Sequence, residues 1–90
     1  MKKQRKKYYR IEWKKSAVKT AKSFPKAIRK KIIETVDKIA EDPLKGKPLR
    51  GGLKGLRRIR IGDLRIIYLL ERRKLTILIV KIGSRGDIYK

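Results

Sequence analysis

The chain has 90 residues, with 29 Lys and Arg against 8 Asp and Glu, for a formal net charge of +21, and 40% of its residues are hydrophobic. This length supports one domain with a modest core, and the absence of cysteine and histidine excludes disulfides, thiol nucleophiles, histidine catalysis and zinc sites. The positive charge opposes compaction and indicates a polyanionic partner, and nucleic acid is favoured over a membrane because no apolar run of about 18 residues is present.

The first half of the chain is predicted to contain a basic tail, a strand and a helical hairpin. Residues 1–7 are basic and aperiodic, so we expect a flexible tail. Alternation over Tyr8–Trp13 predicts a strand, and helical spacing after it predicts a short helix that ends before Pro25. A second helix is predicted to start around Ser23–Lys26 and to end at Asp42-Pro43. Its apolar positions form a stripe suited to burial: Ile28, Ile32, Val36, Ile39 and Ala40.

A loop and three strands are predicted in the second half. Residues 43–55 are rich in Pro and Gly and indicate a loop. Strands are predicted at Leu56–Ile61, Leu64–Glu71 and Thr76–Ile82, with a two-residue turn at Gly62-Asp63 between the first two. We therefore expect residues 8–90 to form a single α+β domain. It would have an antiparallel sheet with an N-terminal strand, a helical hairpin on one face, then a three-stranded meander (β–α–α–β–β–β), with a possible short C-terminal strand.

The predicted hairpin places like charges opposite each other. With a turn at Gly62-Asp63, Arg60 lies opposite Arg65, and Arg58 shares their face because residues two apart point to the same side. Like charges directly opposite destabilise a sheet by a few tenths to about 1 kcal/mol, and we expect neither strand to supply an acid on that face. A bound phosphate would compensate, since the arginine fork matches phosphate oxygens. A solvated basic face is the alternative.

Two residues near the C-terminus extend this hypothesis. The sequence Gly83-Ser84-Arg85-Gly86 places an arginine just after the last long strand, and Tyr89 follows four residues later. If this strand lies beside Leu64–Glu71, both side chains reach the rim of the arginine face. A tyrosine beside cations offers a surface on which an exposed base stacks.

An ordered set of short motifs runs from the loop to the C-terminus. It comprises LRGGLKGL, then R-x-R, then G-x-x-R-x-x-Y from Gly62 to Tyr68, then G-x-R and a near-terminal Tyr. This order resembles the RelE family of toxins, within the RelE/ParE superfamily. The resemblance implies a ribosome-dependent, metal-independent endoribonuclease without a cofactor, which binds the A site of the 70S ribosome. There the ribose 2′-hydroxyl of the mRNA attacks the adjacent phosphate and leaves a 2′,3′-cyclic phosphate. A RelB-like antitoxin is the implied protein partner.

The resemblance also implies roles for individual residues. Catalytic roles fall to Arg60, Arg65, Arg85 and Tyr89, and RNA or phosphate binding falls to Lys54, Arg57 and Arg58. Well-studied RelE toxins carry lysines where this chain has the pair of arginines on its R-x-R strand. Because arginine stays protonated up to about pH 12, it is a poor general base. Proton removal from the 2′-hydroxyl is thus left to Lys54, to Tyr89 or to no side chain.

Two other functions stay open at this point. A ParE-like toxin would bind and inhibit DNA gyrase, and a non-catalytic RNA- or ribosome-binding protein would depend on net charge alone. Cleavage of mRNA on ribosomes against inhibition of DNA supercoiling distinguishes the first alternative from the nuclease. The second predicts that removing any single arginine has little effect. The absence of a segment resembling a signal peptide favours a cytoplasmic location without a membrane partner. The absence of asparagine, beside many Lys, Arg and Ile residues, suggests a heat-adapted source.

Overall fold

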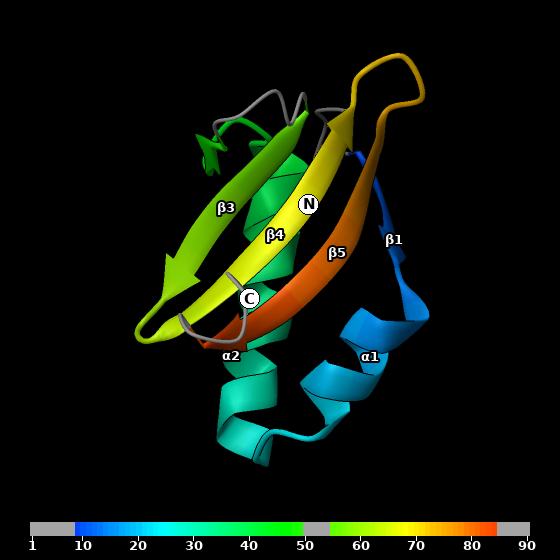
Figure 1. The fold of residues 1–90 in the computed structure, drawn as a ribbon. Coiled ribbons are helices and arrows are strands. Elements are labelled where there is room, and N and C mark those ends of the chain that lie inside the picture. Colours follow the sequence, from blue (N-terminus) through cyan, green and yellow to red (C-terminus); the bar gives the residue numbers. More distant parts are fainter. Residues whose placement is uncertain (1–8, 50–54, 85–90) are drawn as a thin grey trace, which may run out of the picture.

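The computed structural model describes residues 9–49 and 55–84, and its elements follow the predicted order (Figure 1). The N-terminal part contains strand β1 (Arg10–Trp13) and helices α1 (Lys15–Lys22) and α2 (Lys26–Glu41). The remainder contains strands β2 (Lys47–Pro48), β3 (Leu56–Ile61), β4 (Leu64–Glu71) and β5 (Thr76–Ser84). The expected basic tail and the possible C-terminal strand lie outside the described residues.

The five strands form one mixed sheet in the order β1-β5-β4-β3-β2. The predicted meander is confirmed, because β3, β4 and β5 pair antiparallel. The prediction of a wholly antiparallel sheet is wrong for β1, which runs parallel to β5. A tight turn forces neighbouring strands to run antiparallel, but the long connection between β1 and β5, which includes both helices, permits either direction.

The short strand β2 lies inside the predicted loop. Lys47 pairs with Arg58 and Pro48 with Arg57, so β2 forms the outer edge of the sheet. A proline cannot donate to a ladder, and an edge position tolerates this loss. Leu49 continues the contact, because its N–H donates to the carbonyl of Leu56.

The core lies between the helices and one face of the sheet (Figure 1). The predicted stripe of α2 is confirmed, since four of its positions are buried and Ile28 is half-buried against the same cluster. The fully buried side chains of the sheet include Ile66, Tyr68 and Ile77. Burying an aliphatic side chain of this size contributes about 1.5–3 kcal/mol. The opposite face of β3–β5 carries no helix in the described part of the chain.

The hairpin between β3 and β4 has the predicted register. Gly62 has a φ of 57°, which suits the first central position of a type II′ turn. Ile61 pairs with Leu64, Ile59 with Ile66, and Arg60 with Arg65. The apolar partners of this list face the helices, so alternation along the strands turns the arginine pair to the other face.

A bulge interrupts the pairing of β4 with β5. Ile67 pairs with Lys81 and Tyr68 with Ile79, so Val80 is an extra residue in the described ladder. Ile79 and Ile82 are three residues apart, yet both are buried in the core because of this insertion. The bulge therefore places Lys81 on the face that points away from the helices.

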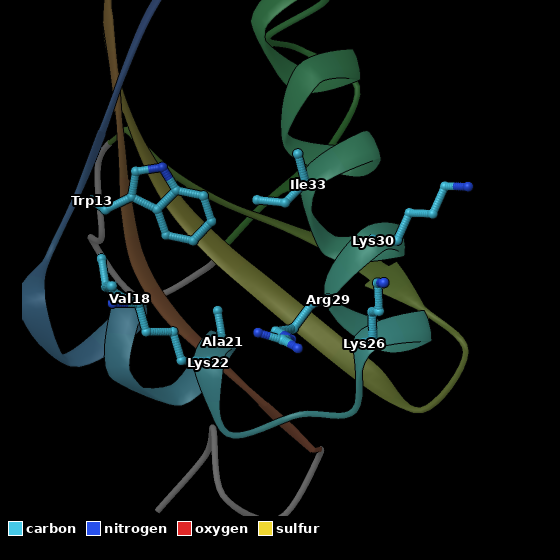
Figure 2. Close-up of a pocket in the computed structure, with 8 residues that line it drawn as sticks. All are labelled: Trp13, Val18, Ala21, Lys22, Lys26, Arg29, Lys30 and Ile33. Atoms are coloured by element: carbon cyan, nitrogen blue, oxygen red, sulfur yellow. The ribbon is translucent and has the colours of Figure 1, made fainter.

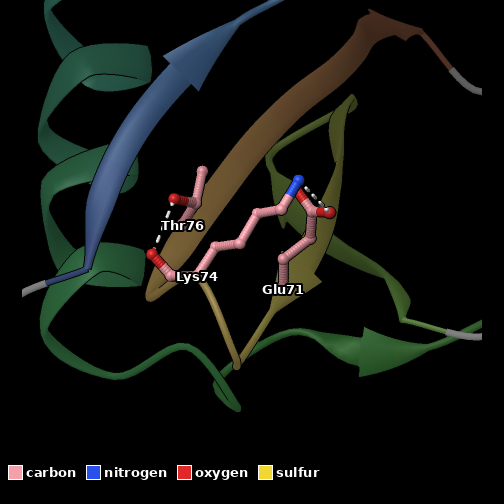
Figure 3. A network of polar contacts seen from close by, with 3 residues as sticks. All are labelled: Glu71, Lys74 and Thr76. Atoms are coloured by element: carbon pink, nitrogen blue, oxygen red, sulfur yellow. Dashed lines mark hydrogen bonds and ion pairs between the residues drawn. The ribbon is translucent and has the colours of Figure 1, made fainter.

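The turn between β4 and β5 is held by local polar contacts (Figure 3). The Thr76 hydroxyl donates to the carbonyl of Lys74 at 3.0 Å, and the Lys74 Nζ lies 3.9 Å from Glu71 Oε2. Leu75 has a positive φ of 49° in the same turn. The ion pair is exposed and contributes at most about 1 kcal/mol, so the turn depends chiefly on its backbone bonds.

Candidate nucleic-acid interface

Cationic side chains gather on the outer face of the described sheet. Arg58 and Arg60 come from β3, Arg65 from β4 and Lys81 from β5, and we call these four residues the basic face. The register places Lys47 of β2, opposite Arg58, and Arg10 of β1 on the same side at the two edges of the sheet. Arg60 and Lys81 are exposed, whereas Arg58 and Arg65 are half-buried. The predicted grouping of the three arginines on one face is confirmed by the strand register.

Lys81 was not predicted from the sequence. Strict alternation counted forward from the buried Ile79 would turn residue 81 toward the helices. The bulge at Val80 reverses this direction, and Lys81 comes to lie across Ile67 from Arg58. A lone lysine in an otherwise apolar strand is the only local signal of this placement.

Arg65 is the least favourably placed cation of the basic face. It lies opposite Arg60 on one side and opposite Gly83 on the other. Its Nε is buried and has no hydrogen-bond partner within residues 9–49 and 55–84. A buried donor without a partner destabilises by about 1–3 kcal/mol, and the opposed like charge adds up to about 1 kcal/mol. An anion bound at this position would reduce both the cost of the donor without a partner and the repulsion between the two arginines.

The arginine pair forms no ion pair with a described carboxylate, although Asp63 of the β3–β4 turn is only two residues from Arg65 in the chain. The expectation that neither strand supplies an acid on this face needs one correction, because alternation places Glu71 of β4 on the same face as Arg65. Glu71 is six residues further along the strand, roughly 20 Å away, and it lies near Lys74 instead. Among the described carboxylates, none forms an ion pair with Arg60 or Arg65.

Replacing Arg60 by glutamate is expected to raise the melting temperature. The exposed Arg60 side chain lies directly opposite Arg65, so the change converts a repulsive cross-strand pair into an attractive one, a gain of roughly 1 kcal/mol. Calorimetry compares this variant with Arg73→Glu, which makes the same charge change in the exposed β4–β5 turn. Equal gains in the two variants would show that net charge, rather than the pairing, limits stability.

Arg57 does not belong to the basic face, although it was assigned to phosphate binding with Arg58. It alternates with Arg58 along β3 and therefore points to the helix side of the sheet. Its Nη1 donates to the carbonyl oxygens of Gly46 at 2.6 Å and of Leu44 at 3.5 Å. Its guanidinium thus holds the loop after α2, and the structure separates it from Arg58.

Tyr68, the last residue of the G-x-x-R-x-x-Y motif, fixes the same loop. Its hydroxyl donates to the carbonyl of Pro43 at 2.7 Å and accepts from the N–H of Gly46 at 3.0 Å. Burial raises the pKa of this hydroxyl, and Asp42 raises it further, against the opposing effects of the Gly46 N–H and Arg57. We call this arrangement of Tyr68, Arg57 and Gly46 the loop clasp.

Replacing Tyr68 by phenylalanine is expected to lower the free energy of unfolding by about 1–3 kcal/mol, because the buried N–H of Gly46 and the half-buried carbonyl of Pro43 lose their partner. The pH dependence should also change. Below about pH 10 the Tyr68 phenol is protonated in both the folded and the unfolded state, so its full contribution to stability is present there. Above this pH the unfolded chain loses the proton first, and stability falls as the pH rises through the raised folded pKa.

Urea unfolding at a series of pH values tests this, with Tyr9→Phe as the control because Tyr9 only packs at the margin of the core. The Tyr68 variant should be less stable at neutral pH and should lose less stability above pH ~10 than the parent. If the free energy of unfolding of Tyr68→Phe equalled that of the parent at every pH, the loop clasp would not stabilise the fold.

The remaining predicted site residues, Lys54, Arg85 and Tyr89, lie outside the described residues. Within the described chain, no group of three acidic, histidine or cysteine side chains is placed to hold a metal ion. None of the described helices is long and apolar enough to cross a membrane.

Comparison with known proteins identifies the family. Residues 6–89 match the family model described as ParE toxin of type II toxin-antitoxin system, parDE. Toxin RelG of Mycobacterium tuberculosis is 29% identical over 84 residues, which are 91% of this chain and 97% of that protein.

Solved structures with the same fold point to the same superfamily. The archaeal RelE-RelB complex from Pyrococcus horikoshii contains a chain that is 32% identical, with a TM-score of 0.78 over 88% of this chain and 97% of that chain. The RelBE2 complex from Mycobacterium tuberculosis contains one that is 27% identical, with a TM-score of 0.78 over 89% and 94%. With the matched family model, these likenesses show that the chain belongs to the ParE toxin family of type II toxin–antitoxin systems, within the RelE/ParE superfamily.

Proposed function

We propose that this toxin is a ribosome-dependent endoribonuclease that cuts mRNA and thereby inhibits translation. The observation that carries the proposal is the basic face, where Arg65 keeps a buried Nε without a described partner opposite the like charge of Arg60. A phosphate of the RNA backbone would supply the missing acceptor and neutralise both guanidinium groups. Action at the ribosome would place the protein in the cytoplasm.

The proposed reaction uses RNA as its own nucleophile. The 2′-oxygen of one nucleotide attacks the adjacent phosphorus, the bond from phosphorus to the 5′-oxygen breaks, and the products are a 2′,3′-cyclic phosphate and a 5′-hydroxyl. The protein then needs to stabilise the charge that builds on the phosphate oxygens. Arg60 and Arg65 would take this role, while Arg58 and Lys81 would hold neighbouring backbone phosphates.

Residues beyond the described chain complete the proposal. Ser84 pairs with Leu64, so β5 ends beside Arg65, and Arg85 is bonded directly to Ser84. This connectivity supports Arg85 as a third cation for the reacting phosphate, with Tyr89 stacking on a base. Arginine does not act as a base at neutral pH, so we assign removal of the 2′-proton to Lys54, to Tyr89 or to water. The ribosome would supply the in-line geometry of attack.

We also infer an antitoxin as the protein partner. Several solved relatives are complexes of RelE with RelB, including those from Pyrococcus horikoshii and Mycobacterium tuberculosis. A toxin of the present family, with a net charge of +21, would favour an acidic RelB-like protein. The 70S ribosome and its mRNA would be the second set of partners.

The matched family model favours a second candidate, inhibition of DNA gyrase by binding, because ParE gives that family its name. Two assays with the purified protein decide between them. Primer extension on mRNA in programmed ribosomes should reveal new 5′ ends, whereas DNA supercoiling by gyrase should be unaffected. Inhibited supercoiling with intact mRNA would overturn the nuclease proposal.

A further inference from the structure

A second pair of opposed cations lies on the outer face of the sheet, at its β2 edge. Lys47 of β2 lies directly opposite Arg58 of β3, so their Cβ atoms are about 5 Å apart. Both side chains point away from the helices, and like charges in this arrangement destabilise a sheet. Lys47 is exposed, and among the described carboxylates none forms an ion pair with it.

The loop clasp determines where Lys47 lies. The N–H of the preceding residue, Gly46, donates to the Tyr68 hydroxyl at 3.0 Å, and the carbonyl of Gly46 accepts from Arg57 Nη1 at 2.6 Å. That carbonyl belongs to the same planar peptide unit as the N–H of Lys47. Tyr68 is fully buried and Arg57 is half-buried, so packing fixes both anchors. The clasp therefore holds the backbone of Lys47 at a defined position beside β3.

This second pair lies next to the site proposed for the reacting phosphate. Arg58 is two residues from Arg60 on the same strand and the same face, a separation of roughly 7 Å. Neighbouring phosphates of an RNA strand are separated by a similar distance. Lys81 of β5 lies in the same row across the sheet, beyond Ile67. A phosphate adjacent to the reacting one would therefore meet Lys47 and Arg58 from two neighbouring strands.

We propose that Lys47 and Arg58 bind the phosphate next to the reacting phosphate, and that Tyr68 and Arg57 are positioning residues that act through Lys47. This phosphate subsite rests on the proposed function, because it takes the same mRNA strand as the rest of the basic face. A bound phosphate would offset the repulsion between the two cations. Tyr68, the last residue of the G-x-x-R-x-x-Y motif, thus serves RNA binding from the helix side of the sheet without touching the RNA.

Binding of an uncleavable RNA tests the subsite without the ribosome. The probe is a short fluorescent single-stranded RNA, 2′-O-methylated throughout, and fluorescence anisotropy gives its Kd at a series of salt concentrations. Lys47→Ala should raise Kd about tenfold and lower the slope of log K against log salt by about 0.7, the value for one phosphate contact. Two controls remove the same charge and should leave Kd nearly unchanged. They are Lys45→Ala, exposed in the same loop, and Lys30→Ala on α2, which Figure 2 shows beside a groove on the helix side of the sheet.

The positioning role predicts coupling between the loop clasp and Lys47. Tyr68→Phe releases Gly46 and should raise the Kd of the same RNA, at a temperature where circular dichroism verifies that the variant is folded. In the Lys47→Ala background the same change should raise Kd no further, because the side chain that the clasp positions is already absent. Additive losses of affinity would show that Tyr68 acts on the fold as a whole, and would overturn the positioning role.

Ribosome assays separate the subsite from the nuclease itself. Lys47→Ala should raise the KM of mRNA cleavage on programmed ribosomes more than it lowers kcat, because a contact to the neighbouring phosphate is the same before and during bond breaking. Weaker binding of this variant to ribosomes without mRNA would assign Lys47 to ribosomal RNA and overturn the subsite. An unchanged Kd for the RNA probe would overturn it as well, with cleavage by the parent intact. If the parent cut no mRNA, the nuclease proposal would fail, and the probe would still decide whether Lys47 binds RNA.

Discussion

Replacing Arg65 by alanine is expected to lower the rate of mRNA cleavage on programmed ribosomes by about 10²- to 10³-fold, the usual effect of removing a preorganised group that stabilises developing charge. The variant should fold as well as the parent, because it loses a buried donor without a described partner and the repulsion from Arg60. Single-turnover cleavage measures the rate, and a sedimentation assay measures ribosome binding. Most of the ribosome affinity should persist, since the chain carries 29 Lys and Arg.

Arg72→Ala is the matched control for this experiment, because Arg72 is exposed in the β4–β5 turn, away from Arg60 and Arg65. It removes the same charge and should leave the cleavage rate within a few-fold of the parent. If both variants lost cleavage and ribosome affinity together, the chain would act as a general polycation, and the alternative of a non-catalytic RNA-binding protein would be preferred.

Replacing Gly46 by alanine is expected to give the largest loss of stability. A Cβ at this position would lie 2.6 Å from the Tyr68 hydroxyl oxygen and 2.8 Å from the carbonyl oxygen of Arg58. Tyr68 is buried and the Arg58 carbonyl is backbone, so neither moves easily, and the loop clasp opens. Overpacking of this kind costs about 1–3 kcal/mol or more, which lowers the melting temperature by roughly 5–20 °C in a domain of this size.

Gly62→Ala provides a contrast for that measurement. Gly62 has a φ of 57°, but none of the described atoms lies within 4 Å of an added Cβ. The cost is therefore backbone strain alone, about 1–2 kcal/mol. Calorimetry should find Gly46→Ala the less stable of the two. A Gly46→Ala variant as stable as the parent would show that the loop does not depend on its close contact with Tyr68.

The features predicted from the sequence are those that local physics determines. A two-residue turn at Gly62-Asp63 fixes which residues face each other, so the opposition of Arg60 and Arg65 followed from counting. The buried stripe of α2 followed from helical periodicity in the same way.

The features that sequence reasoning missed depend on contacts distant in the chain. The parallel direction of β1 is set by its pairing with β5, more than sixty residues later, and no local pattern records it. The bulge at Val80 turns Lys81 outward because the core accepts both Ile79 and Ile82. Alternation alone would have placed Arg57 and Arg58 on opposite faces of the sheet. The hydrogen bonds from Arg57 to the carbonyl oxygens of Gly46 and Leu44 depend on the folded loop and could not be predicted.

The most direct test of the account observes the side chain of Arg65 by NMR. The probe is a short RNA with a 2′-O-methyl group at its central nucleotide, which blocks attack on the adjacent phosphate. The account predicts that the Nε–H resonance of Arg65 shifts saturably as this RNA is added, while that of Arg72 does not move. Equal shifts of all arginine Nε–H resonances, or an unperturbed Arg65, would show that no phosphate binds between Arg60 and Arg65.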